Sequence, residues 1–313
     1  MSDERLRELL EVQAYFGLPS PALVEKDFYV VKALAAIAAI DTAPLRLVFG
    51  GGTALSRAHR LVRRMSEDID LRIVGDKPPG RGALRRLRDT ITQALLSTGF
   101  KFDPKDPAYR KSGNESRYTI YRLPYEPAAT GEGALRPTIQ IETAVWPLRR
   151  PAVERPVISF VAEALQRPPE IASIACVSIL ETAADKFVGL TRRAGAELAG
   201  LDEPDPALVR HLYDLHALRG HYDPAEVAPL AREVMLADAE AYGNQFPDYR
   251  ENPIRETLRA VEGLAADPSY AGRYGEFQRL MVYGNEVEYT ACINTLRELG
   301  GQTGAAPVKR EGS

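Results

Sequence analysis

Residues 45–74, LRLVFGGGTALSRAHRLVRRMSEDIDLRIV, constrain the fold more than any other part of the sequence. The segment opens with an apolar run of strand length, followed by three glycines, a threonine and a short arginine-rich stretch. It closes on DIDLRI at 68–73, where polar and apolar residues alternate with the period of a half-buried strand. Such a strand directs Asp68 and Asp70 to one face and the apolar residues to the core. The segment therefore predicts two strands joined by a glycine turn and a short helix, with two carboxylates side by side.

Paired carboxylates beside a glycine turn suit divalent metal ions that hold a triphosphate. Mg²⁺ prefers oxygen ligands and keeps several waters, so two or three carboxylates near the substrate phosphates suffice. The backbone N–H groups of Gly51 and Gly52 can approach phosphate oxygens because no Cβ intervenes, and Thr53 adds a hydroxyl. The segment lacks the Lys-Ser/Thr pair of a P-loop and the glycine pattern of a dinucleotide site. We therefore expect transfer of a nucleotidyl group from an NTP, with Mg²⁺, or alternatively Mn²⁺, at Asp68 and Asp70.

Composition excludes several other classes of protein. The net charge of −3 excludes a globally basic nucleic-acid binder, so any nucleic-acid contact needs a local patch. One candidate patch is the basic run between the glycines and the aspartates: Arg57, His59, Arg60, Arg63 and Arg64. Two cysteines are too few for a disulfide framework or a thiolate metal site. No apolar run has the length of a membrane span, and the charged N-terminal residues do not resemble a signal peptide, so we expect a cytoplasmic protein.

The first half of the chain reads as mixed α and β structure. Helical spacing predicts helices over 1–16, from Ser20-Pro21 onward and over 83–96, and strand-like patterns occupy 118–123 and 138–145. In the first part of the second helix, Glu25-Lys26-Asp27 has the placement of residues that interact only with the helix dipole. Glu142 shares a strand face with Gln140, and we consider it as a third metal ligand.

The second half carries almost no strand signal. Five prolines between residues 147 and 169 predict a domain boundary, which we place after residue 150. Ser178 and Glu181 form a capping box at the start of a helix, and Asp205-Pro206 is typical of the start of another helix that runs to residue 219. We therefore expect a nucleotidyltransferase domain with N-terminal helices at 1–150, an α-helical domain at 151–300 and a disordered tail at 301–313.

The order of these motifs resembles a known family. GGG-Thr53 followed by RMSEDIDL at 64–71 is similar to the signature of the DNA polymerase β-type nucleotidyltransferase superfamily, and more narrowly to the AbiEii/AbiGii toxin family. VEKDF at 24–28 is similar to that family's N-terminal helix, residues 178–193 with Lys186 to its third motif, and RHLYDL at 210–215 to its fourth. The resemblance implies an α+β fold in which a polymerase β-type domain with a small mixed sheet is joined to an α-helical C-terminal domain.

The resemblance also implies roles for individual residues. Asp68, Asp70, Lys186 and Asp214 would be catalytic, and Asp68 and Asp70 would hold the metal, to which the strand pattern adds Glu142 as a third candidate ligand. The nucleotide-binding set would be Gly51, Gly52, Thr53, Arg64, Ser66 and Lys186. The acceptor would be the 3′ end of tRNA, whose modification would block translation, and an antitoxin protein would be the partner.

Other interpretations of the same residues stay open. An exposed lysine beside Asp185 commonly forms only a surface ion pair, and Asp214 lies four residues after Arg210, which is enough for a structural role. A nucleotidyltransferase acting on a protein or a small molecule would keep the same metal site. A catalytically idle regulatory module would keep the fold, but the presence of all four catalytic candidates argues against it.

Overall fold

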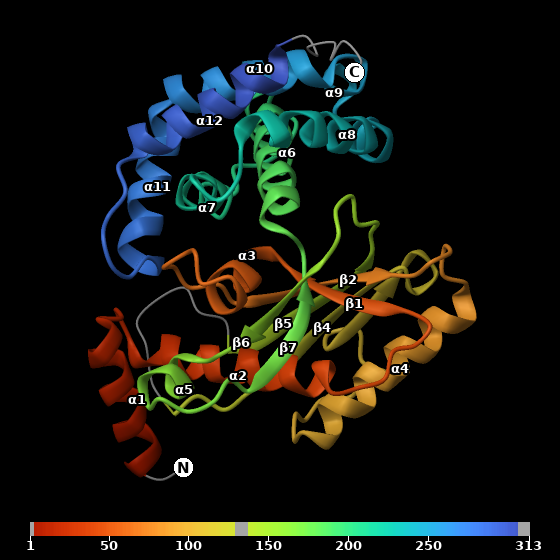
Figure 1. The fold of residues 1–313 in the computed structure, drawn as a ribbon, viewed down its shortest axis with the longest axis vertical. Helices are drawn as coiled ribbons and strands as arrows, with labels where there is room; N and C mark the ends of the chain where they lie inside the picture. The colour runs from red at the N-terminus through yellow and green to blue at the C-terminus, as the bar shows by residue number, and fades with distance from the viewer. Residues whose placement is uncertain (1–2, 129–136, 306–313) are drawn as a thin grey trace, which may run out of the picture. The chain divides into compact units, whose positions relative to one another are not determined.

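The computed structural model describes residues 3–128 and 137–305. The chain forms two compact units, Met1–Val177 and Ser178–Ser313, which Figure 1 shows in colours running from red to green and from green to blue. The first unit is mixed α/β and the second is helical, as the sequence predicts. Among the described residues, no helix is long and apolar enough to cross a membrane.

A seven-stranded mixed sheet organises the first unit, with the strand order β3-β4-β5-β2-β1-β7-β6. Its strands are β1 (Arg46–Gly50), β2 (Asp68–Val74), β3 (Arg110–Gly113), β4 (Tyr118–Pro124), β5 (Thr138–Val145), β6 (Val153–Val157) and β7 (Ile171–Cys176). Its helices are α1 (Asp3–Phe16), α2 (Pro21–Ala38), α3 (Gly51–Thr53), the π-helix η1 (Ala54–Ala58), α4 (Arg81–Ser97), the 3-10 helix η2 (Asn114–Ser116) and α5 (Phe160–Ala164).

Strand pairing fixes which side chains are neighbours around the predicted carboxylates. β2 pairs antiparallel with β1 and parallel with β5, and β5 pairs antiparallel with β4. In this register Asp70 lies opposite Gly50 on one side and Glu142 on the other, while Asp68 lies opposite Gln140. Paired residues direct their side chains to the same face, so the sheet gathers these polar groups on one surface.

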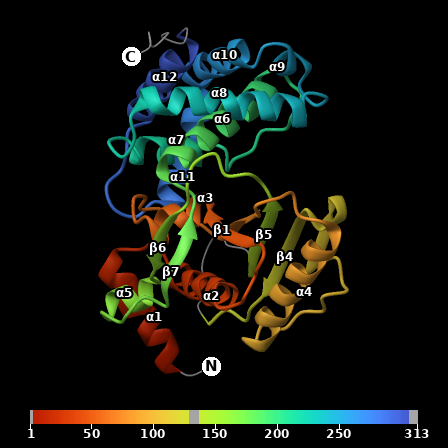
Figure 2. The ribbon, with the colours of Figure 1, turned by 45° about the vertical axis from the view of Figure 1, so that its right-hand side comes forward.

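The opposite face of the sheet carries the hydrophobic core of this unit. Ile69, Leu71 and Ile73 of β2 are buried against apolar residues of α2 and α4, as the alternation predicts. Ser20 accepts a hydrogen bond from the Ala22 N–H and begins α2, as a serine before proline is expected to do. Figures 1 and 2 show α2 and α4 on this side of the sheet.

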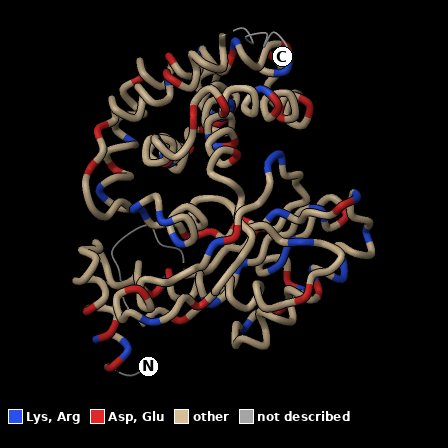
Figure 3. Tube along the Cα trace, viewed as in Figure 1, with Lys and Arg blue, Asp and Glu red and all other residues tan. Residues whose placement is uncertain are grey.

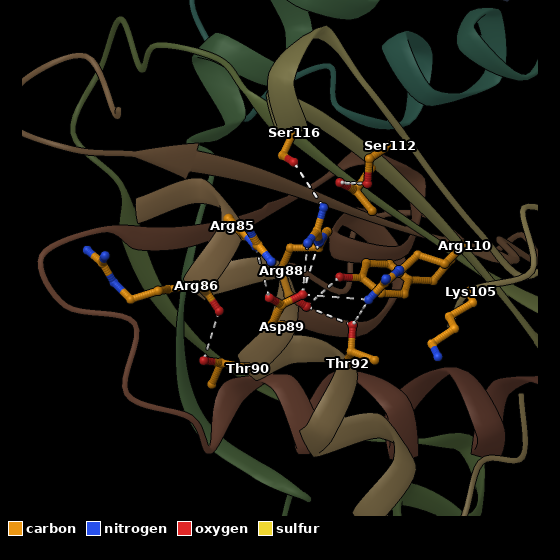
Figure 4. Close-up of polar contacts among 12 residues, drawn as sticks. Arg85, Arg86, Arg88, Asp89, Thr90, Thr92, Lys105, Arg110, Ser112 and Ser116 are labelled. Carbon is orange, nitrogen blue, oxygen red and sulfur yellow. Dashed lines mark hydrogen bonds and ion pairs between the residues drawn. The ribbon is translucent and has the colours of Figure 1, made fainter. Parts of the chain in front are cut away.

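Arg88 of α4 links the helix to the segment between β3 and β4 (Figure 4). It is half-buried and donates to Asp89 at 3.0 Å and to Ser116 at 3.3 Å. Arg110 of β3 donates to Thr92 of α4 at 3.0 Å. Arg85 is exposed. Part of the positive charge of α4 is therefore used within the fold.

The second unit consists of helices around α6. They are α6 (Ile179–Leu198), α7 (Arg210–Ala217), α8 (Pro224–Tyr242), α9 (Pro247–Glu251), α10 (Pro253–Ala266), α11 (Pro268–Met281) and α12 (Tyr289–Gly304). Ser178 caps α6 by accepting from the Glu181 N–H at 3.3 Å, as the capping-box pattern predicts. α6 packs against α7, α8 and α10, and α12 packs against α7, α8 and α10.

Three expected boundaries differ from the structure. The first unit extends to Val177 rather than to residue 150, because residues 151–177 supply β6, α5 and β7 to its sheet. The helix expected from Asp205 begins at Arg210, because residues 206–209 form tight turns. The tail expected to be disordered from residue 301 is helical through Gly304, and residues 306–313 lie outside the described part of the chain.

Candidate active site

The glycine turn and β2 lie in direct contact. Gly50 ends β1, and Gly51 begins α3 with a φ of 71°, in the left-handed region that favours glycine. A Cβ on Gly51 would lie 1.8 Å from Oδ2 of Asp70. The missing side chain therefore leaves room for the Asp70 carboxylate, and any other residue at position 51 would displace it.

Gly52 plays a similar part for two other predicted residues. A Cβ on Gly52 would lie 2.4 Å from an Nη atom of Arg64 and 2.7 Å from Oγ of Ser66. Arg64 is buried, and its guanidinium also donates to the Met65 carbonyl at 2.9 Å. The structure thus brings Arg64 and Ser66 to the glycine turn. It leaves their role in nucleotide binding a prediction.

Thr53 joins the turn to the first catalytic candidate. Its hydroxyl is buried and donates to the backbone carbonyl of Asp68 at 2.5 Å. The hydroxyl that was expected to contact the nucleotide therefore holds β2 against α3. A π-helix, η1, follows directly, and π-helical turns occur frequently at functional sites.

Glu142 lies beside Asp70 on the next strand, and both of its oxygens accept hydrogen bonds. Tyr118 donates to Oε2 at 3.1 Å and Gln140 donates to Oε1 at 2.8 Å. Within residues 3–128 and 137–305, no group of three or more His, Cys, Asp or Glu side chains is placed to hold a metal ion. The donor set that fits a divalent cation is the pair of carboxylates on β2, because Mg²⁺ completes its octahedron with water and phosphate oxygens. The third-ligand role of Glu142 stays a prediction.

The charged residues of α2 have a larger role than interaction with the helix dipole, so that expectation was incomplete. Glu25, Lys26 and Asp27 are all buried. Lys26 donates to the Thr138 carbonyl at 2.5 Å, and its Nζ lies 3.2 Å from Oε2 of Glu67, the residue before Asp68. Lys26 therefore ties α2 to the start of β5 and to the segment that leads into β2.

Asp27 makes a second connection, to the π-helix beside the glycine turn. Its Oδ1 lies 3.0 Å from Nε of Arg57, and its Oδ2 accepts from the Phe160 N–H at 2.7 Å. The Arg57 guanidinium also lies 3.6 Å from the centre of the Phe160 ring. Burial raises the pKa of Asp27 to about 6, although the charge of Arg57 acts in the opposite direction. These contacts hold η1 against α2 and α5.

The basic run at 57–64, the candidate patch for nucleic-acid contact, is only partly on the surface. Arg57 and Arg64 are buried, and Arg60 pairs with Glu163. His59 donates a hydrogen bond from Nε2 to the Val177 carbonyl at 3.0 Å, and burial lowers its pKa. Figure 3 shows basic and acidic residues interspersed over both units. Arg57 and Arg64 therefore act within the fold, whereas Arg60 and Arg63 are exposed.

In the second unit, Lys186 and Asp214 form a buried pair. Nζ of Lys186 on α6 lies 2.7 Å from Oδ2 of Asp214 on α7, and both side chains are almost fully buried. His211, on the same helix as Asp214, has its Nδ1 buried without a hydrogen-bond partner among the described residues. Burial, and then the charge of Lys186, hold the pKa of His211 well below its usual range, so this imidazole is neutral at pH 7. The surface-lysine interpretation of Lys186 is therefore excluded.

Sequence reasoning missed the contributions of α2. One signal could have indicated that these charges are buried. The three charged residues stand between Val24 and Phe28, which belong to an apolar stripe, and charged residues that face solvent seldom cluster on a helix with so little exposed surface.

Comparisons with known proteins agree with this architecture. The sequence profile of the family described as nucleotidyl transferase AbiEii toxin, type IV TA system, matches residues 32–293. No curated protein matches the sequence significantly. A similar solved structure is MenT4, a nucleotidyltransferase toxin from Mycobacterium tuberculosis, with 18% sequence identity, a TM-score of 0.58, and coverage of 95% of this chain and 89% of that chain.

The extent of the profile match establishes the family, and the likeness to MenT4 shows the fold. Membership in this family implies an NTP substrate and an antitoxin partner, and the family generally uses a divalent metal. The chain belongs to the AbiEii nucleotidyltransferase toxin family of type IV toxin–antitoxin systems.

Proposed function

We propose that this toxin transfers a nucleoside monophosphate from an NTP to the 3′ end of tRNA in the cytoplasm, with Mg²⁺, and so blocks translation. The observation that carries the proposal is the contact between the Asp70 carboxylate and Gly51, which joins a metal-binding group to a phosphate-binding turn. The family membership adds the reaction class, and the acceptor follows from the toxin resemblance.

In the proposed reaction, the 3′ oxygen of the acceptor attacks the α-phosphorus of the NTP. The bond to pyrophosphate breaks, and the hydroxyl proton is lost to solvent. Asp68 and Asp70 would hold Mg²⁺, which neutralises phosphate charge and favours the attacking oxygen. The N–H groups at Gly51 and Gly52 would bind phosphate oxygens, because Gly50, the residue before α3, has no side chain to cap them. Arg64 adds positive charge beside the turn.

We also propose roles for Lys186 and Asp214 of the second unit. Lys186 is held by its 2.7 Å pair with Asp214, so its ammonium has a defined position for contact with phosphate oxygens. The neutral His211 beside them adds no positive charge to that of Lys186. We assign Lys186 to the triphosphate and Asp214 to the placement of Lys186.

The test is incorporation of each α-labelled NTP into total RNA, protein and small molecules, with wild type, Asp70→Ala and Asp76→Asn. Asp76 is exposed in the turn after β2 and serves as a matched acidic control. We expect label in tRNA with wild type and Asp76→Asn, and none with Asp70→Ala. Label in protein or a small molecule alone would replace the tRNA acceptor by another, and no labelled product at all would favour an idle regulatory module.

A further inference from the structure

Tyr118 lies on the sheet face that carries the predicted metal ligands. In the register of the sheet, Arg72 of β2 lies opposite Ala144 of β5, which lies opposite Tyr118 of β4. Two residues further along these strands, Asp70 of β2 lies opposite Glu142 of β5. Residues two apart along a strand share a face, so Tyr118 and both acids project from the same surface.

The environment of the Tyr118 side chain agrees with this placement. Its hydroxyl donates to Oε2 of Glu142 at 3.1 Å, yet 38% of this residue's surface is exposed. The hydroxyl end of the side chain is therefore held by Glu142, while part of the residue remains open to a ligand.

Strand order places Tyr118 on the side of the carboxylates away from the glycine turn. The glycine turn follows β1, and β2 separates β1 from β5 and β4. The turn is the part of the site suited to the triphosphate. The second substrate, the acceptor, would then reach the predicted metal ligands from the opposite side, over β5 and β4.

We propose that the ring of Tyr118 is a stacking platform for the terminal nucleobase of the RNA acceptor. The inference rests on the proposed function and makes Tyr118 a residue that selects the acceptor. Aromatic side chains on a sheet face bind unpaired bases in this way, because every base presents a flat π surface. Arg122 lies on the same strand and face as Tyr118. It is opposite Gln140, which is opposite Asp68, so a positive charge lies on this face near Asp68 and can contact the RNA backbone.

The test compares Tyr118→Ala, Tyr118→Phe and the control Tyr15→Ala, which removes an exposed tyrosine from α1. Removal of one stacked base platform lowers affinity by roughly five- to a hundredfold. We expect Tyr118→Ala to raise the KM for tRNA about tenfold, with the KM for NTP unchanged. Tyr118→Phe and Tyr15→Ala should keep both KM values close to wild type. Fluorescence anisotropy of a labelled tRNA without NTP should rank the variants in the same order.

Each contrary outcome identifies a different error. Equal losses in Tyr118→Ala and Tyr118→Phe would show that the hydrogen bond to Glu142 matters and the ring does not. A higher KM for NTP alone would assign the ring to the nucleotide. An unchanged KM for tRNA would overturn the platform while leaving the proposed reaction intact. Wild-type enzyme that labels no RNA would refute the proposed acceptor and the platform together, and it would do so before any Tyr118 variant is assayed.

Discussion

Replacing Asp27 with asparagine should change how the stability of the first unit depends on pH. The pKa of Asp27 is about 6 in the folded protein against an ordinary value of 3.8, because burial disfavours the charged carboxylate more than Arg57 and the Phe160 N–H favour it. A folded-state pKa above the unfolded value means that the folded protein binds the proton more tightly. The stability that Asp27 contributes is therefore fully present below about pH 4 and is lost as the pH rises to about 6.

The size of this effect follows from the two pKa values. They differ by about 2 pH units, and each unit corresponds to about 1.4 kcal/mol, which gives about 3 kcal/mol. Asparagine does not titrate. The free energy of unfolding of wild type, measured relative to Asp27→Asn, should therefore fall by about 3 kcal/mol between pH 3 and pH 7. In Arg57→Met the charge that lowers this pKa is gone, so the loss should continue above pH 6.

Urea unfolding followed by tryptophan fluorescence measures this quantity. Trp146 is the one tryptophan of the chain and lies in the first unit, so its signal reports the unit that contains Asp27. Asp76→Asn, which removes an exposed carboxylate, should keep the wild-type pH profile. Parallel profiles for wild type and Asp27→Asn would refute the reasoning, because they would show that Asp27 titrates alike in the folded and unfolded chain.

Three further predictions concern the site. Gly51→Ala should lower the rate of transfer about a hundredfold in a folded protein, because its Cβ would displace Asp70 and the positive φ costs about 1 kcal/mol; labelling at a near-wild-type rate would contradict this. Lys186→Met should destabilise the second unit by about 3–5 kcal/mol in thermal unfolding, because it removes the buried ion-pair partner of Asp214. The double variant Lys186→Met/Asp214→Leu should recover part of this loss, and equal instability of the single and double variants would exclude the ion pair as the cause. Chelation with EDTA should abolish labelling and added Mg²⁺ should restore it, whereas labelling that persists in EDTA would exclude the metal role of Asp68 and Asp70.

Local patterns in the sequence were enough to predict the elements that build the site. The alternation in β2, the serine before α2 and the capping box of α6 each depend on residues within a few positions of one another. The buried charges of α2 could not be predicted in this way. Lys26 bonds to a carbonyl 112 residues away, and Asp27 to an N–H 133 residues away, so only the folded chain supplies their partners.

The domain boundary was misplaced for a related reason. Proline cannot donate to a strand ladder, and five prolines at 147–169 therefore favoured a linker. β6 is an edge strand of the sheet and accommodates Pro156, where the ladder is open on one side. Its exposed residues lack the alternation that identifies β2, so no local signal assigned this strand to the first unit.

The central claim is that the carboxylates of β2 direct addition of a nucleotide to the end of tRNA. Mass spectrometry of the 3′-terminal fragments of tRNA, after incubation with NTP and Mg²⁺, tests it most directly. With wild type we predict a gain equal to one or more nucleoside monophosphate residues on the 3′ fragment, and with Asp70→Ala no gain. An unchanged 3′ fragment with active wild-type enzyme, or the same gain with Asp70→Ala, would contradict the account.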